Sequence, residues 1–430
     1  MADLTGLFDI EDLARPDIHV DDLNWLLVWS YGMGADSTAG IVRTILDPAF
    51  RHPALLPDLS NLILVTAQTG DEFHSLAALV EKHVLPLLRS HNIRMVEVAR
   101  AGPSTDDGIV VLQDTRQPHR MHFDAREHRF YALGDENREN GIQPQKSGKR
   151  KCTLKSKGWP MDTWRDRELG TQPYFHAIGY NHDEWRRIAK EPVLKLGGHR
   201  EMIYPIHDAG WIRQHCREYL FELFGVWWPK SLCAECPYVS KTEWPEQLSR
   251  MLAEPETTAR HVVNEFVALA FNPRSGLFGP DDTLTDRLRA SGAASILEPA
   301  EREIFAGPWA LYRVRRIYFA PGAAWRSVET VFRGTPQQTG RLLRGLARKV
   351  HLPAETDKRG HTRLWLARRP LDSKTYPQVE GFFTIAPAHV ADKQRDGFER
   401  HWVTHTSDAL RELDMKAADH LHRRQDTLTA

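Results

Sequence analysis

The chain is poor in cysteine, has no net charge and contains no long apolar run. Four cysteines in 430 residues are too few for a disulfide framework, so cysteines that group together are better candidates for metal, cluster or redox chemistry. Lys and Arg balance Asp and Glu at 57 each, which argues against attraction of the whole molecule to nucleic acid or to an anionic membrane. No apolar stretch reaches the ~18 residues that span a bilayer, and the acidic first residues lack the basic and apolar regions of a signal peptide. We therefore expect no membrane partner and a cytoplasmic location.

Apolar segments of strand length alternate with helical periodicity in the first half of the chain. The apolar run at 24–30 leads through a glycine-containing loop into a helix-compatible stretch at 39–46. A second run at 61–67 precedes helical periodicity at 75–91, and a third strand is expected at 93–100. Strands alternating with helices indicate βαβ units. The pattern predicts an α/β fold with a parallel, doubly wound sheet.

Composition changes after about residue 245. Residues 253–307 are helical in pattern, and residues 311–370 contain 14 Lys and Arg against 3 Asp and Glu. We expect a nucleotide-binding domain with a cysteine site at 1–245 and a mostly helical, basic accessory domain at 246–430.

The basic segment 311–370 also contains aromatic residues, namely Tyr312, Tyr318, Trp325 and Trp365. Arginine mixed with aromatic residues suits phosphate contact and base stacking, so this segment is a candidate for binding nucleic acid or another substrate. A basic surface that balances the acidic N-terminal residues explains the composition equally well.

The loop at 30–38, SYGMGADST, lies between a predicted strand and a predicted helix, where backbone N–H groups and the helix dipole can hold an anion. Gly32 and Gly34 allow the backbone to approach a phosphate closely. The loop also offers three hydroxyl side chains, those of Ser30, Ser37 and Thr38. Asp36 can act through Mg²⁺ or by bracing the loop. An ordinary turn of small residues has the same composition, and neither a Walker A loop nor a G-x-G-x-x-G fingerprint is present.

Further short motifs follow this loop in a fixed order. They are T-G-D-E at 69–72, K-C-T at 151–153 with Lys157, I-G-Y at 178–180 ahead of Arg187, Y-P-I at 204–206, and C-A-E-C-P at 233–237. Together with the loop, they resemble the phosphoadenosine-phosphosulfate reductase-like family of the PP-loop ATP pyrophosphatase superfamily. The resemblance covers residues 24–240 and implies an adenine nucleotide alpha hydrolase-like fold.

The resemblance also implies roles for individual residues. The loop is expected to bind the β,γ-phosphates of ATP with Mg²⁺, or the anion of a sulfonucleotide, with Thr69, Gly70 and Gly179 at the same site. Asp36, Lys157 and Arg187 are the expected catalytic residues, because cations aimed at polyphosphate stabilise the charge that develops when ATP is split. Ala35 replaces the lysine that usually precedes the aspartate in this family.

The four cysteines are a candidate metal site. Cys233 and Cys236 form a C-x-x-C pair, and the family motifs also contain Cys152 and Cys216. Four thiolates can hold a zinc ion or a [4Fe–4S] cluster. Sulfur-inserting relatives hold a cluster with such a set, so the resemblance favours iron–sulfur. Buried thiols beside an empty, reduced pair remain the alternative.

The resemblance implies an enzyme that adenylates a nucleotide substrate and releases pyrophosphate, for modification such as sulfur insertion into a nucleotide or nucleic acid. It is compatible with partner proteins of a modification system. A sulfonucleotide reductase or hydrolase is one alternative, although the Glu-Cys-Gly tail of the true reductases is missing. A nucleotide-sensing subunit that binds nucleic acid without turnover is another.

Overall fold

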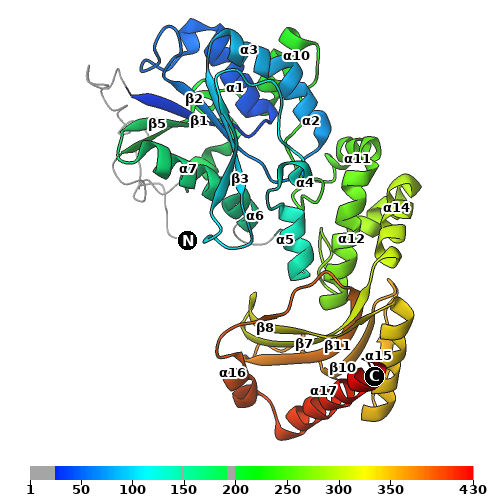
Figure 1. The fold of residues 1–430 in the computed structure, drawn as a ribbon. Helices are drawn as coiled ribbons and strands as arrows, with labels where there is room; N and C mark the ends of the chain where they lie inside the picture. The colour runs from blue at the N-terminus through cyan, green and yellow to red at the C-terminus, as the bar shows by residue number, and fades with distance from the viewer. Residues whose placement is uncertain (1–24, 145, 147–149, 191–198, 430) are drawn as a thin grey trace, which may run out of the picture. The chain divides into compact units, whose positions relative to one another are not determined.

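The computed structural model describes residues 25–144, 146, 150–190 and 199–429, which form two compact units (Figure 1). The first unit contains the described residues up to Thr69 together with 74–130 and 153–231. The second contains 70–73, 131–152 and the chain from Leu232 onward. The expected domain boundary at 245/246 thus lies inside the second unit. In the described residues, no helix is both long and apolar enough to cross a membrane.

The first unit is built on a six-stranded sheet in the order β4-β3-β2-β1-β5-β6. Its strands are β1 (Leu26–Ser30), β2 (Leu62–Ala67), β3 (Arg94–Arg100), β4 (Ile109–Thr115), β5 (Tyr174–Ile178) and β6 (Arg200–Ile203). Neighbouring strands are parallel except for β4, which is antiparallel to β3. The predicted α/β class is confirmed, with a mixed, mainly parallel sheet where a parallel one was expected.

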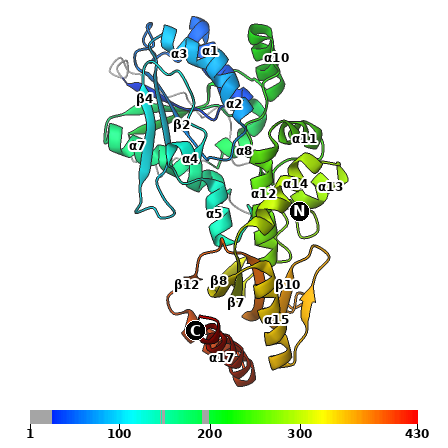
Figure 2. The same cartoon turned by 45° about the vertical axis from the view of Figure 1, so that its right-hand side comes forward.

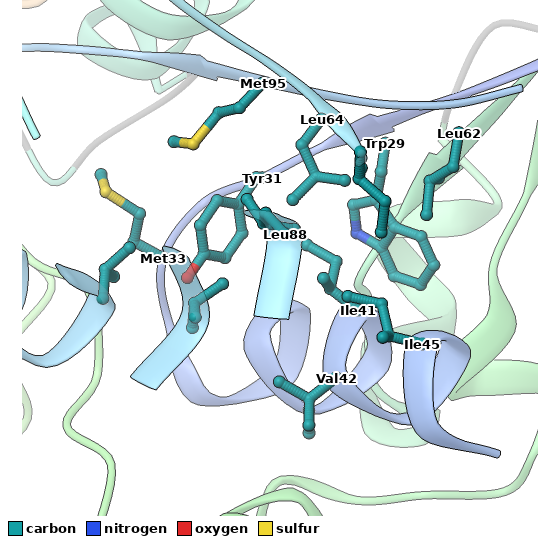
Figure 3. Packing of buried hydrophobic residues seen from close by; sticks show 14 of the residues in the cluster. Trp29, Tyr31, Met33, Ile41, Val42, Ile45, Leu62, Leu64, Leu88 and Met95 are labelled. Atoms are coloured by element: carbon teal, nitrogen blue, oxygen red, sulfur yellow. The ribbon is translucent and has the colours of Figure 1, made fainter. Parts of the chain in front are cut away.

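Helices cover both faces of this sheet because the strands are apolar on both sides. One face packs against α1 (Ala35–Leu46), α3 (Leu85–Ser90) and α10 (Arg213–Phe224), and the other packs against α7 (Trp159–Leu169). Figure 3 shows Trp29 of β1 beside Ile41 and Ile45 of α1. A Cβ on Gly40 would lie 2.7 Å from the Trp29 ring, so glycine is what allows α1 to lie this close to β1.

The strand order reverses at β1 and β5, whose carboxyl ends lie at the same edge of the sheet because the two strands are parallel. The chain leaves β1, passes through α1 and returns in β2 on one side, whereas β5 lies on the other side of β1. Ligands of open α/β sheets bind where the strand order reverses in this way. The short elements η6 (His182–Glu184), α8 (Trp185–Ile188) and α9 (Pro205–Asp208) follow β5 and β6 at the same edge.

The second unit begins with helices that share one apolar core. They are α11 (Trp244–Ala253), α12 (Pro255–Phe271), α13 (Leu284–Ala290) and α14 (Ala294–Ala306). Helix α5 (Leu133–Asn140) contacts α12. Glu265 of α12 is fully buried there and accepts hydrogen bonds from the backbone of Leu277, Leu284 and Thr285. It thereby fixes the loop that leads into α13.

The second unit also contains a six-stranded antiparallel sheet in the order β12-β8-β7-β11-β10-β9 (Figure 2). Its strands are β7 (Trp309–Ala320), β8 (Ala323–Gly334), β9 (Ala354–Thr356), β10 (Thr362–Ala367), β11 (Gln378–Pro387) and β12 (Lys393–Gln394). Two helices, α15 (Pro336–Val350) and α17 (Asp408–Thr429), pack on one face and α12 packs on the other. The shorter α16 (Phe398–His405) contacts β7 and β8.

The prediction of a mostly helical accessory domain did not include this sheet. The basic composition of 311–370 hid it, because arginines occupy strand positions that apolar residues usually fill. In β7 these arginines pair with carboxylates inside the unit.

Candidate anion-binding site in the first unit

The loop between β1 and α1 is held in an unusual backbone conformation. Met33 has a left-handed backbone (φ 60°), and its side chain is fully buried in the core (Figure 3). The carbonyl of Met33 accepts a hydrogen bond from Nε1 of the buried Trp228 at 2.9 Å. A strained residue of this kind persists only where its surroundings fix it, and such residues cluster at functional sites.

Helix α1 begins at Ala35 without a side-chain cap. Gly34 is the N-cap residue and has no side chain that could accept a hydrogen bond from the first turn. The first N–H groups of a helix have no partner inside the helix and carry the positive end of its dipole. This end of α1 is therefore an electrostatically favourable place for an anion.

The glycines of the site differ in how much space surrounds them. A Cβ on Gly179 would lie 2.6 Å from Cα and 3.0 Å from the backbone N of Ser37, so the segment after β5 packs directly on the first turn of α1. A Cβ on Gly34 would lie 3.0 Å from Ser231 Oγ. Gly32 is open, because the nearest atom to its Cβ position is Ser37 Oγ at 3.8 Å. Close packing therefore requires glycine at 179, and it does not at 32.

Ser30, at the end of β1, has a hydroxyl group whose orientation follows from its neighbours. Arg200 Nε donates to Nδ1 of His176 at 2.8 Å, so Nδ1 is an acceptor and the network assigns the ring proton to Nε2. His176 Nε2 then donates to Ser30 Oγ at 2.7 Å, and Arg165 Nη1 donates to the same oxygen at 3.3 Å. With two donors at its oxygen, the Ser30 hydroxyl retains its own proton to donate to a ligand.

The surroundings of His176 keep its ring neutral and leave a positive charge behind Ser30. Burial, followed by the charges of Arg165 and Arg200, lowers the pKa of His176 well below its usual value. Asp162 bridges the two arginines, with Oδ1 at 2.5 Å from Arg165 Nη2 and 3.0 Å from Arg200 Nη1. Two cations against one carboxylate favour an anion near Ser30.

Asp36, in the first turn of α1, is buried and bound by two neighbours. Its Oδ2 accepts from Nδ2 of Asn181 at 3.0 Å and from Nη2 of Arg213 at 2.8 Å. Arg213 is the first residue of α10, and Asn181 follows Gly179 by two positions. Two roles were predicted for Asp36. These contacts allow it to brace the loop, and a contact with Mg²⁺ stays a prediction.

The other hydroxyl groups of the loop face the loop itself. Ser37 Oγ donates to the carbonyl of Gly34 at 3.3 Å. Thr38 is fully buried, and its Oγ1 lies 3.2 Å from the hydroxyl of Tyr31. Of the three predicted hydroxyl donors, Ser30 is the one whose neighbours direct its proton to a ligand.

The remaining predicted residues lie on several segments. Thr69 is buried just beyond β2, and Gly70, which opens a part of the chain belonging to the second unit, has a left-handed backbone (φ 78°). Lys157 lies in a π-helical turn (Leu154–Gly158) that packs against β2 and β3. Arg187 Nη1 donates to Glu184 at 2.6 Å, and its guanidinium lies 4.2 Å from the ring centre of Tyr180. Tyr180 follows Gly179 directly, which keeps Arg187 near this edge of the sheet.

The cysteines are distributed over both units. Cys216 lies in the apolar core of the first unit, where burial, and then the charge of Asp36, raises the pKa of its thiol to about 12. Cys152, Cys233 and Cys236 are partly exposed and belong to the second unit. Nowhere in the described chain do three or more His, Cys, Asp or Glu side chains come together in a way that could hold a metal.

Within the described residues, the apolar core that encloses Cys216 contains no second cysteine. The [4Fe–4S] cluster, like its zinc alternative, stays a prediction.

The C-x-x-C loop is anchored by a buried charged cluster in the second unit. His261 of α12 lies between Asp71 and Glu235, with Nε2 at 3.5 Å from Asp71 and Nδ1 at 3.2 Å from Glu235. Burial opposes a charge on His261, but Glu235 and then Asp71 raise its pKa above the usual value. Glu72 pairs with Cys233 in a β-bridge. The T-G-D-E and C-A-E-C motifs are thus neighbours in the fold.

Three of the four aromatic side chains predicted to stack on bases pack against other residues of the second unit, and base stacking stays a prediction. Tyr312 is fully buried, and its hydroxyl donates to the carbonyl of Pro387 at 3.3 Å. Trp365 packs on Phe382, with ring centres 4.6 Å apart. Trp325 is enclosed by three side chains, those of Phe319, Arg395 and His401.

Sequence reasoning missed the residues that orient the site: His176, Arg165, Arg200, Asp162, Asn181 and Arg213. A histidine within the apolar strand YFHAI is a weak signal of a buried, hydrogen-bonded polar group. The other five residues have no local sequence pattern that indicates their role. Comparisons of the chain with protein-family models, curated proteins and solved structures returned no match.

Proposed function

We propose that the first unit binds ATP at the amino end of α1 and adenylates an acceptor. In the reaction, an acceptor oxygen bonds to the α-phosphorus while the α–β bridging bond breaks and pyrophosphate leaves. The amide groups of α1, the Ser30 hydroxyl and the charges of Arg165 and Arg200 attract the pyrophosphate portion. The adenylated oxygen is then displaced, with AMP as leaving group, by a nucleophile such as sulfur. The expected product is a modified nucleotide or nucleic acid.

The orientation of Ser30 is the observation that carries this proposal. An uncapped helix end at a strand-order reversal is a common feature of α/β folds. A serine whose proton is left available by a neutral histidine and a buried arginine is a second, independent feature that suits an anion. Arg165 is 2% exposed, and its Nε has no hydrogen-bond partner among the described residues. Asp162 balances the charge of this guanidinium at 2.5 Å, so Nε is the part of Arg165 whose burial is not compensated.

The positioning of Asp36 supports the same proposal. Its links to Asn181 and Arg213 join three segments, those after β5, before α10 and at the start of α1. Gly179, packed on Ser37, fixes the same junction. The loop at 30–38 is therefore preorganised, which lowers the free-energy cost of ordering it when the nucleotide binds.

Calorimetric titration with ATP and Mg²⁺ tests the proposal, with Ser30→Ala as the variant and Ser90→Ala as its matched control. Ser90 is exposed and ends α3, just before β3 begins, so it lies at the opposite edge of the sheet. A hydrogen bond to a charged group contributes about 1.5–3 kcal/mol. Ser30→Ala should therefore weaken ATP binding by roughly 10- to 150-fold, and Ser90→Ala should leave it unchanged.

Two results of these titrations would contradict the proposal. Equal affinity in both variants would remove Ser30 from the site. Binding of a 3′-phosphoadenosine sulfonucleotide without binding of ATP would favour the reductase or hydrolase alternative. Release of pyrophosphate from ATP, measured with candidate acceptors, then separates an enzyme from a nucleotide-sensing subunit.

A further inference from the structure

Seven of the 14 cations of the segment 311–370 form two groups with different surroundings. Three arginines of β7, Arg313, Arg315 and Arg316, have side chains that are at most 13% exposed. They pair with carboxylates on α17, α16 and β11. These arginines hold the second unit together and are not available to a ligand.

Helix α15 carries the second group on its outer face. Arg341, Arg344, Arg348 and Lys349 are exposed, while the leucines of the helix pack on the sheet. The helix contains neither Asp nor Glu, and within the described part of the chain no ion pair joins these four cations to a carboxylate. Arg348 and Lys349 stabilise the negative end of the helix dipole. Arg341 and Arg344 lie in the middle of the helix, where the dipole does not explain them.

Arg341 and Arg344 line an open groove of about 530 Å³ beside α15. The Arg344 guanidinium lies over Gly340, and its Nη1 is 3.4 Å from the position of a Cβ on that glycine, an ordinary contact distance. Pro336 and Ile385 form another part of the groove wall. The groove therefore presents two cations along one side.

A deeper cavity of about 550 Å³ adjoins this groove, because Pro336 and Ile385 line both. Its wall includes Phe266, Phe305 and Trp309. Phe305 is 59% exposed and stacks on Trp309, with ring centres 5.7 Å apart and planes 14° apart. An exposed ring supported from behind is a stacking platform for a flat ligand.

The charged residues of the cavity leave its rim weakly positive. Asp286 pairs with Arg359 at 2.7 Å and with Arg289 at 3.3 Å, so two cations share one carboxylate. Lys358 and Glu301 complete the charged lining. A ligand that enters here meets an apolar, aromatic wall with cations at its entrance.

We propose that the second unit binds single-stranded nucleic acid, with phosphates along Arg341, Arg344 and Arg348 and one base on Phe305 in the adjoining cavity. Anionic lipids and phosphopeptides satisfy the cations but provide no flat ring beside each phosphate. A duplex keeps its bases paired and cannot insert one. That this nucleic acid is the acceptor of adenylation rests on the proposed function of the first unit.

Fluorescence anisotropy with a short labelled single-stranded DNA, without ATP, tests the binding. The full chain is compared with Arg344→Gln and with Arg400→Gln, whose exposed arginine on α16 is the matched control. Each phosphate contact on a single strand contributes about −0.7 to the slope of log K against log salt. Arg344→Gln should weaken binding and reduce that slope by about 0.7, whereas Arg400→Gln should change neither.

Phe305→Ala tests the stacking separately. Loss of one stacked base should weaken binding by about 5- to 150-fold and leave the salt slope unchanged. Equal binding by Arg344→Gln and Arg400→Gln, an unchanged affinity in Phe305→Ala, or a preference for duplex DNA or anionic vesicles would overturn the proposal. Because ATP is absent from the assay, none of these results bears on nucleotide binding by the first unit.

Discussion

Replacement of Gly179 by alanine should disturb both the stability of the first unit and its affinity for ATP. The new Cβ would lie 2.6 Å from Cα and 2.9 Å from Cβ of Ser37, distances that real Cβ atoms do not show. These are backbone and adjacent atoms, so α1 and the segment after β5 must move apart. Overpacking of this kind costs about 1–3 kcal/mol.

The shift also moves the first turn of α1 relative to Ser30 and Asn181. Gly32→Ala is the matched control for stability, because its new Cβ would have no protein neighbour closer than 3.8 Å. Hydrogen exchange of peptides from β1 and α1, followed across a urea series, reports the free energy of unfolding of this unit alone. Calorimetric titration reports the affinity for ATP. Wild-type stability and affinity in Gly179→Ala would refute the packing argument.

Three further predictions concern Asp36 and Cys216. If Asp36 braces the loop through Arg213, Asp36→Asn should weaken ATP binding equally with and without Mg²⁺ in calorimetric titrations. A loss of affinity confined to the titration with Mg²⁺ would instead make Asp36 a metal contact. Because the pKa of Cys216 is raised to about 12, its thiol should resist iodoacetamide at pH 8 in the folded chain, and modification in step with Cys152 would contradict its placement in the core. The same shift makes the protonated Cys216 thiol a source of stability that is complete below the ordinary thiol pKa of 9.0 and lost as the pH rises through about 12. The difference in unfolding free energy between wild type and Cys216→Ala should therefore shrink above about pH 9.

Local signals in the sequence predicted the main elements of the first unit. The apolar run at 24–30 and the small residues after it became β1, the strained loop and α1, because short-range patterning determines a strand–turn–helix unit. Helical spacing also carried information that went unused. Cys216 and Leu220, four residues apart, both lie on the buried side of α10, which is typical of core residues.

The arrangement around Ser30 could not be predicted in the same way. His176 lies 146 positions after Ser30 in the sequence, and Arg165 and Arg200 come from different elements. Parallel pairing of β1 with β5 brings them together, and no local pattern specifies which strands pair. The second sheet was missed for a related reason, since the arginines of β7 look exposed until their partners on α16 and α17 are known.

Hydrogen exchange with and without ATP and Mg²⁺ is the most direct test of the central claim, that the nucleotide binds at the amino end of α1. The account predicts that ATP slows exchange in peptides covering 30–38 and 176–182, and that Ser30→Ala abolishes this protection while Ser90→Ala retains it. Unchanged exchange in both segments at saturating ATP, or protection confined to the second unit, would contradict it.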